Sequence, residues 1–230
     1  MSGEAGPAIR AAGLVFAYGK GDPVLDIEKL AIARGEKVFL FGPSGSGKTT
    51  LLGLVAGVLK PPKGTLHVLD RDLGAMSGPA RDAFRASHIG YVFQMFNLIP
   101  YLDVRDNIAL PMRMNAERRR RLSAPLDEAV ADAAEHLGIG HMLGERVTRL
   151  SVGQQQRVAA ARALVGAPEV IVADEPTSAL DADRRHAFLD LLFRSVSEVG
   201  STLVFVSHDL SLADRFDRTI SLPEINTAGA

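Results

Sequence analysis

Residues 42–49 read Gly-Pro-Ser-Gly-Ser-Gly-Lys-Thr and fit the pattern G-x-x-x-x-G-K-[ST], which constrains the fold more than any other part of this chain. The preceding residues, 37–41, predict a short buried strand, and residues 50–59 are apolar at helical spacing. A strand, a glycine-rich loop and a helix in this order direct backbone N–H groups and the positive end of the helix dipole at one point. The sequence therefore predicts a P-loop that binds the phosphates of a nucleoside triphosphate.

Residues of the loop have separate predicted roles. Lys48 can reach the β- and γ-phosphates, and the Thr49 hydroxyl can bind Mg²⁺. The glycines let the backbone approach the ligand without a Cβ clash. The predicted nucleotide-binding positions here are Gly42, Ser44, Gly45, Ser46, Gly47, Lys48, Thr49 and Thr50.

Composition excludes several classes of function. The 230 residues contain no cysteine, which rules out disulfides, thiol catalysis and cysteine metal sites. The net charge of −1 argues neither for nor against a polyanionic partner. The N-terminal residues do not resemble a signal peptide, and no 18-residue window is apolar and free of charge. We therefore expect a soluble cytoplasmic protein whose membrane role, if it has one, depends on a partner.

Short apolar runs alternate with helical patterns and predict an α/β fold with a mainly parallel sheet. Between residues 94 and 150 the pattern becomes helical and is interrupted by prolines, which predicts an inserted helical lobe. The tail, residues 223–230, is expected to be disordered. Strands are predicted at 14–18, 65–69, 89–93, 170–173 and 202–206, and helices at 104–114, 126–137, 155–165 and 182–199.

Two further motifs carry chemistry. Residues 170–175 form an apolar strand that ends in two acids, of which Asp174 suits Mg²⁺ and Glu175 suits an attacking water. Ser151 and Gln154 fit a capping box at a helix start, whose free N–H groups could bind a phosphate delivered by another molecule. The arginine-rich run at 117–121 could grip phospholipid or nucleic acid, but we interpret it as a solvated face and assign it no function.

From about Gly13 to about Phe216 the chain resembles an ABC-type ATPase cassette, whose signature Leu-Ser-x-Gly-Gln stands at residues 150–154 with Val152 in place of the usual first glycine. The resemblance implies a P-loop NTPase (RecA-like) core, an N-terminal antiparallel β subdomain and an inserted α-helical subdomain. It places one ABC ATPase domain at residues 8–222, with the core at 8–93 and 156–222 and the helical insert at about 94–155.

The same resemblance implies a role for each matched residue. Tyr18 would stack on adenine, Gln94 would join Mg²⁺ and the lytic water, and His208 would contact the γ-phosphate. The loop that ends at Asp181 would couple two sites across a dimer. The implied catalytic residues are Glu175, His208, Lys48 and Gln94, the metal ligands are Thr49, Gln94 and Asp174, and the remaining nucleotide contacts are Tyr18, Ser151, Gly153, Gln154 and Asp181.

In that family two cassettes face each other head to tail with ATP and Mg²⁺ between them, and each works with separate transmembrane permease subunits. The resemblance thus implies a homodimer held on the inner face of the membrane, with no nucleic-acid partner. Residues 94–100 and 151–156 resemble the lipoprotein-releasing and macrolide-exporting branch, which implies export or extraction of a lipophilic, lipoprotein or peptide substrate. Val147 and residues 222–224 depart from the usual pattern.

Two alternatives remain. An ATP-gated scaffold of the cell-division type would share the whole cassette chemistry and transport nothing. A DNA-repair or chromosome ATPase would carry long coiled coils or zinc modules before the signature. Only about a hundred residues separate Lys48 from Ser151, without cysteine or heptads, so the second alternative is disfavoured.

Overall fold

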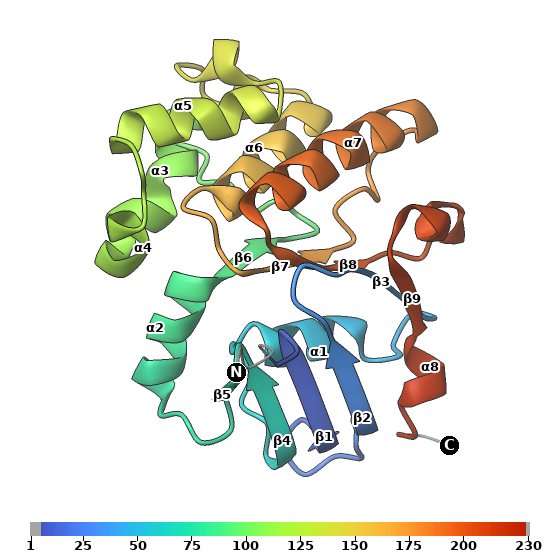
Figure 1. The fold of residues 1–230 in the computed structure, drawn as a ribbon. Helices are drawn as coiled ribbons and strands as arrows, with labels where there is room; N and C mark the ends of the chain where they lie inside the picture. Colours follow the sequence, from blue (N-terminus) through green and yellow to red (C-terminus); the bar gives the residue numbers. More distant parts are fainter. Residues whose placement is uncertain (1–5, 229–230) are drawn as a thin grey trace, which may run out of the picture. The chain divides into compact units, whose positions relative to one another are not determined.

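The computed structural model describes residues 6–228 (Figure 1). The chain divides into two compact units, residues 1–85 with 202–230 and residues 86–201. No helix among the described residues is long and apolar enough to cross a lipid bilayer.

An antiparallel sheet in the first unit has the strand order β2-β1-β4-β5 (Figure 1). Apolar side chains on β1 point to the core at Ile9, Ala11, Leu14 and Phe16, and the alternation is typical of a half-exposed strand. This sheet agrees with the expected antiparallel β subdomain. Its strands are β1 (Ile9–Phe16), β2 (Leu25–Ile32), β4 (Lys63–Val68) and β5 (Arg71–Asp72).

A second sheet in the same unit is parallel, with β3 (Lys37–Phe41) between β8 (Thr202–Val206) and β9 (Arg218–Ser221). Phe39 on β3 is fully buried and its ring stacks against Phe205 at a centroid distance of 6.3 Å. A central strand buried on both faces reads as a continuous apolar run, which is why the sequence revealed it. The rigid end of β3 fixes the position of the loop that follows.

Helix α1 (Lys48–Val55) begins directly after that loop. It is shorter than predicted, because Gly57 adopts a left-handed conformation with φ of 69° and ends the helix before residue 59. The first unit also contains the 3₁₀ helix η3 (Leu210–Arg215) and most of α2 (Gly78–His88).

The prediction of a disordered tail is wrong for residues 223–228. Helix α8 (Leu222–Ile225) follows β9, and its first residue, Leu222, is fully buried. Asn226 then hydrogen-bonds to the start of β2. Burial and these bonds offset the entropy cost of ordering the segment. Residues 229–230 lie outside the described part of the chain.

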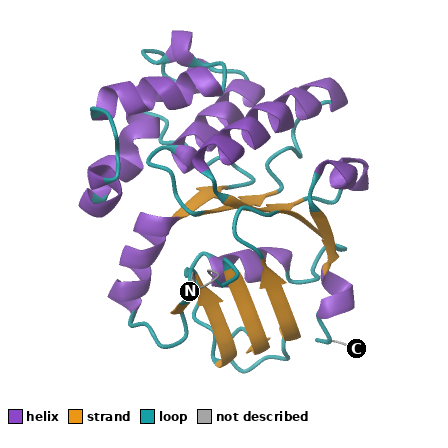
Figure 2. Ribbon diagram, viewed as in Figure 1, coloured by secondary structure: helices purple, strands orange, loops and turns teal. Residues whose placement is uncertain are grey.

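In the second unit, β6 (Ile89–Val92) and β7 (Val170–Asp174) pair in parallel, with Val92 opposite Ala173. Figure 2 shows that most of the rest of this unit is helical. The predicted helical lobe contains α3 to α5 and two 3₁₀ helices, and α6 and α7 follow it. These elements are α3 (Val104–Met114), α4 (Ala116–Arg120), α5 (Leu126–His136), η1 (Gly140–Met142), η2 (Val147–Arg149), α6 (Val152–Leu164) and α7 (Ala182–Val199).

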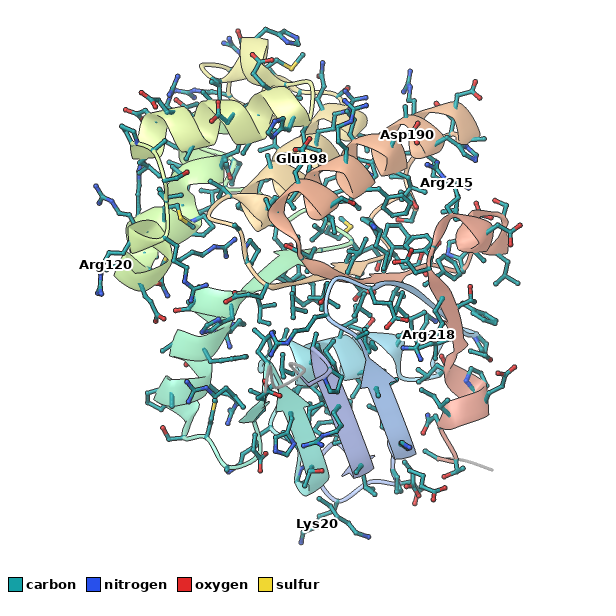
Figure 3. The ribbon with its side chains drawn as sticks, viewed as in Figure 1. Lys20, Arg120, Asp190, Glu198, Arg215 and Arg218 are labelled. Carbon is teal, nitrogen blue, oxygen red and sulfur yellow. The ribbon has the colours of Figure 1, made fainter. Side chains whose placement is uncertain are left out.

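The arginine-rich run is not uniformly solvated, so the interpretation as a solvated face is wrong for Arg118. Its side chain is only 2% exposed, and its guanidinium donates hydrogen bonds to backbone carbonyls at 2.7 to 3.3 Å. Arg121 pairs with Glu169 at 3.0 Å. Arg120 does point outward from α4 (Figure 3). One member of the run is therefore a core residue of the second unit.

Candidate functional site

Residues 42–47 form a tight loop between β3 and α1, and Lys48 and Thr49 are the first two residues of the helix. Gly45 and Gly47 have φ values of 80° and 99°, which L side chains rarely adopt. A Cβ on Gly47 would also lie 2.7 Å from the Leu25 side chain. The Lys48 ammonium donates hydrogen bonds of 2.8 Å to the carbonyls of Gly42 and Pro43. The loop thus closes on itself at the N-terminus of α1, with a cation beside it, which is the geometry of an anion site.

Tyr18 lies next to this loop. Its hydroxyl is 3.1 Å from the Thr50 hydroxyl, and its ring meets Phe16 edge-on at 4.9 Å. The side chain is 56% exposed, so these contacts hold the ring while leaving much of it accessible to a flat ligand. Thr49, the predicted magnesium ligand, is exposed beside Thr50.

His208 follows β8 in the same unit. The Ser207 amide donates to the Leu40 carbonyl at 3.3 Å, so the chain leaving β8 is tied to the end of β3. His208 is exposed one residue further on. The structure thus brings the loop, Tyr18 and His208 into one unit.

The remaining predicted residues lie in the second unit. Because β6 and β7 are parallel and Val92 pairs with Ala173, Gln94 and Asp174 emerge at the same edge of the strand pair. Gln94 is exposed, whereas Asp174 is only 7% exposed. Burial, and to a lesser extent the Asp174 charge, raise the pKa of Tyr91 on β6. Asp174 therefore acts as a negative charge close to this edge.

Glu175 has a left-handed backbone with φ of 47°. Such a conformation is uncommon for a residue other than glycine and is found at functional sites. The Glu175 carbonyl accepts a hydrogen bond from the Ser178 amide at 3.2 Å, which closes a turn directly after the strand. The turn carries the chain away from β7 immediately after the two acids.

The predicted capping box is confirmed. The Ser151 hydroxyl accepts from the Gln154 amide at 3.4 Å, and the Gln154 side chain accepts from the Ser151 amide at 2.8 Å. The helix itself, α6, begins at Val152 rather than at residue 155. The N–H groups of Val152 and Gly153 belong to the first turn and have no acceptor within the helix.

The start of α6 borders a hollow of about 310 Å³ that is also lined by Arg157 and Arg184. Asp181 caps the neighbouring helix α7, accepting from the Arg184 amide at 2.9 Å and pairing with its guanidinium at 3.3 Å. Helix N–H groups and arginine side chains together favour an anionic ligand. The hollow is lined by Ser151, Gly153, Gln154, Arg157, Leu180, Arg184 and Phe188.

Two residues that sequence reasoning missed hold the loop after Gln94. Arg162 on α6 donates to the carbonyls of Phe96 and Asn97 at 2.6 and 2.7 Å. Asn107 on α3 both accepts from the Ile99 amide at 2.8 Å and donates to its carbonyl at 3.1 Å. Neither residue belongs to a short motif, so only their long-range partners reveal the role.

Within residues 6–228, no group of three or more His, Cys, Asp or Glu side chains is arranged to hold a metal ion. Magnesium, however, needs only one or two protein ligands when phosphates supply the rest. The Thr49 hydroxyl, the Asp174 carboxylate and the Gln94 amide oxygen are the hard oxygen donors that this ion prefers. The donor set of the predicted residues therefore fits magnesium.

Comparison with known proteins gave matches over nearly the whole chain. Residues 25–178 match the family described as ABC transporter. The uncharacterized ABC transporter ATP-binding protein YbbA of Escherichia coli is 42% identical over 207 residues, 89% of each chain. The lipoprotein-releasing system ATP-binding protein LolD of Anaeromyxobacter dehalogenans is 40% identical, over 94% of this chain and 90% of its own. The macrolide export ATP-binding/permease protein MacB of Rhodopirellula baltica is 39% identical, over 94% of this chain and 32% of its own.

Solved structures agree with the sequence matches. The dimeric structure of MJ0796, described as a bacterial ABC transporter cassette, superimposes with a TM-score of 0.81 at 32% identity and 93% coverage of both chains. A post-hydrolysis dimer of the same cassette, bound to ADP and phosphate, gives a TM-score of 0.77 at 33% identity. The fold expected from the sequence is thus confirmed.

Proposed function

Because the chain belongs to the ABC transporter family and is one of its ATP-hydrolysing, ATP-binding cassettes, we propose that two copies close head to tail around two ATP molecules. The observation that carries this proposal is the hollow at the start of α6, where helix N–H groups meet Arg157 and Arg184. It suits the γ-phosphate of an ATP held on the other copy's loop. The MJ0796 relative, which is dimeric, supports the same assembly.

Each predicted residue then has a task. Lys48 and the N-terminus of α1 neutralise phosphate charge, and Tyr18 holds the adenine. Glu175 orients and deprotonates the attacking water, with His208 and Gln94 fixing its position. Ser151, Gly153 and Gln154 form the cap against the second copy's ATP, and Asp181 couples the two sites. Magnesium, held by Thr49, Asp174 and Gln94, would add positive charge beside the phosphates.

A glutamine at position 175 tests this scheme. Glu175→Gln keeps the shape of the side chain but removes the base, so ATP should bind, resist hydrolysis and hold the dimer closed. Light scattering should show a dimer with ATP and Mg²⁺ and a monomer without nucleotide. Adding Lys48→Ala to the variant is the matched control and should abolish the dimer. A Glu175→Gln protein that stays monomeric with ATP and Mg²⁺ would refute head-to-tail closure.

We further propose that the closed dimer drives a separate membrane permease that exports or extracts a lipophilic, lipoprotein or peptide substrate. The named relatives LolD and MacB serve lipoprotein release and macrolide export, which supports this class of substrate. The permease would hold the cassette on the inner face of the membrane. Met95 and Tyr101, next to the Gln94 loop, are 82% and 76% exposed and could contact it.

Affinity capture tests the partner. Tagged Glu175→Gln, solubilised from membranes with ATP, should recover a polytopic protein, and Met95→Ser with Tyr101→Ser should lower that recovery while the ATP-bound dimer persists. Substrate should then stimulate ATP hydrolysis in the reconstituted complex. Recovery of soluble or nucleic-acid-bound proteins alone would contradict the transport proposal and leave the ATPase intact.

A further inference from the structure

We propose that the C-terminal segment, residues 222–227, is a built-in brace for the phosphate loop and that Asn226 is its positioning residue. This inference rests on the proposed function of residues 42–49 as the phosphate site. In Figure 1, α8 lies beside β2. Asn226, the residue after α8, hydrogen-bonds to Asp26 near the start of that strand.

Asn226 joins two separate stretches of backbone with one side chain. Its amide nitrogen donates to the Ser46 carbonyl at 3.2 Å and to the Val24 carbonyl at 3.0 Å. Its amide oxygen accepts from the Asp26 amide at 2.7 Å. The Ser46 carbonyl lies within the phosphate loop, whereas Val24 directly precedes β2 and Asp26 is the second residue of that strand. One side chain therefore ties the loop to a strand of the antiparallel sheet.

A second contact from the same segment reaches the other end of the loop. A Cβ on Gly42 would lie 3.1 Å from Pro223 Cδ, so the proline ring packs against the glycine that opens the loop. The loop also packs on residue 24, because a Cβ on Gly47 would lie 3.1 Å from the Val24 carbonyl. The segment thus touches the loop at Gly42 and at Ser46, on either side of its exposed tip.

These contacts matter because the loop binds phosphate through backbone N–H groups rather than through side chains that can adjust. A loop that is already ordered in the free protein binds more tightly, because binding then carries no entropy cost of ordering the loop. Removing the brace should therefore weaken nucleotide binding without touching any group that contacts the nucleotide. Such a loss is the same in the ground state and the transition state, so KM should rise while kcat stays constant.

Asn226→Ala tests the brace, and Thr227→Val is the matched control. From the same segment, the Thr227 hydroxyl donates to the Asp26 carbonyl at 3.1 Å, so this bond ends on β2 rather than on the loop. One neutral hydrogen bond corresponds to a factor of about 2 to 10 in affinity. We expect Asn226→Ala to raise KM for ATP and the Kd for ADP, measured by calorimetry, by that factor, and Thr227→Val to leave both at their wild-type values.

Asn226→Asp covers the case in which the alanine variant does not fold. The carboxylate still accepts from the Asp26 amide but cannot donate to Ser46 or Val24, so it should also weaken ADP binding. Wild-type KM and Kd in either folded variant would overturn the brace. Failure of the wild-type chain to bind ATP would instead refute the phosphate site itself, which keeps the two outcomes distinct.

Discussion

Arg118→Met should destabilise the second unit by an amount that can be worked from its contacts. Its guanidinium donates to the carbonyls of Ala163 and Val165 at 2.7 Å and of Ile89 at 3.3 Å. The first two carbonyls stand at the end of α6, where no N–H group of the helix donates to them. The substitution leaves all three carbonyls without this donor. At about 1–3 kcal/mol for each buried carbonyl, the loss is about 6 kcal/mol.

An opposing effect reduces that figure. Burial, with a smaller contribution from the Arg121 charge, lowers the pKa of Arg118 to about 10. The lowering corresponds to about 3 kcal/mol that the fold gives up to keep the guanidinium charged, and methionine does not incur that cost. The hydrogen bonds outweigh the desolvation, and a net loss of about 3 kcal/mol remains. We therefore expect the guanidinium to stabilise the fold although its charge is buried.

Urea unfolding measures this loss. With an m-value of about 3 kcal/mol/M, the midpoint should fall by about 1 M in Arg118→Met. Arg120→Ala is the matched control because its side chain is exposed on the same helix (Figure 3), and it should change stability by no more than about 0.5 kcal/mol. Equal midpoints for the two variants would show that the hydrogen bonds from Arg118 to these carbonyls do not stabilise the fold.

Two further predictions concern the nucleotide. Tyr18→Ala should weaken ATP binding about 5- to 150-fold in calorimetry, because base stacking on an aromatic ring contributes about 1–3 kcal/mol. Tyr18→Phe keeps the ring and loses only the Thr50 hydrogen bond, so it should bind ATP within about 10-fold of wild type. Equal affinities for the alanine variant and the wild-type chain would exclude stacking. Ser151→Ala should lower stability in urea unfolding by about 1 kcal/mol, because the helix cap is lost. Ser151→Asp should restore the stability but not the ATPase rate, because the aspartate charge would repel the γ-phosphate of the ATP bound to the second copy. Full activity in the aspartate variant would argue against the phosphate cap.

Much of the core could be predicted from the sequence because its elements carry their own signals. Strand β8 and helix α7 match the predicted 202–206 and 182–199. Each is an apolar run or a helical pattern bounded by polar or breaking residues. Strand β2 was missed because charged residues such as Glu28 and Lys29 occupy its exposed positions. It forms because β1 pairs with it, and that partner lies outside any local window.

The candidate site divides in the same way. Motif residues such as Lys48, Glu175 and Ser151 could be named from the sequence because the chemistry requires them at fixed spacing. Residues that hold their loops could not. Arg162 and Asn226 each stand far along the chain from the carbonyls that they bind, and one polar residue in a helix or a tail gives no indication of its partner.

A common physical demand explains why those hidden residues recur. Loops that carry function cannot satisfy their backbone carbonyls through a regular ladder, and an unsatisfied carbonyl is costly where water is excluded. Three loops or turns in the described part of the chain have such a long-range donor: Asn226 for the phosphate loop, Arg162 for the loop after Gln94, and Arg118 for the turn after α6. All three have guanidinium or amide N–H groups that can reach several carbonyls at once. Substitution of Asn226 or Arg162 should therefore loosen loops that carry the proposed site while leaving every group proposed to contact the ligand in place.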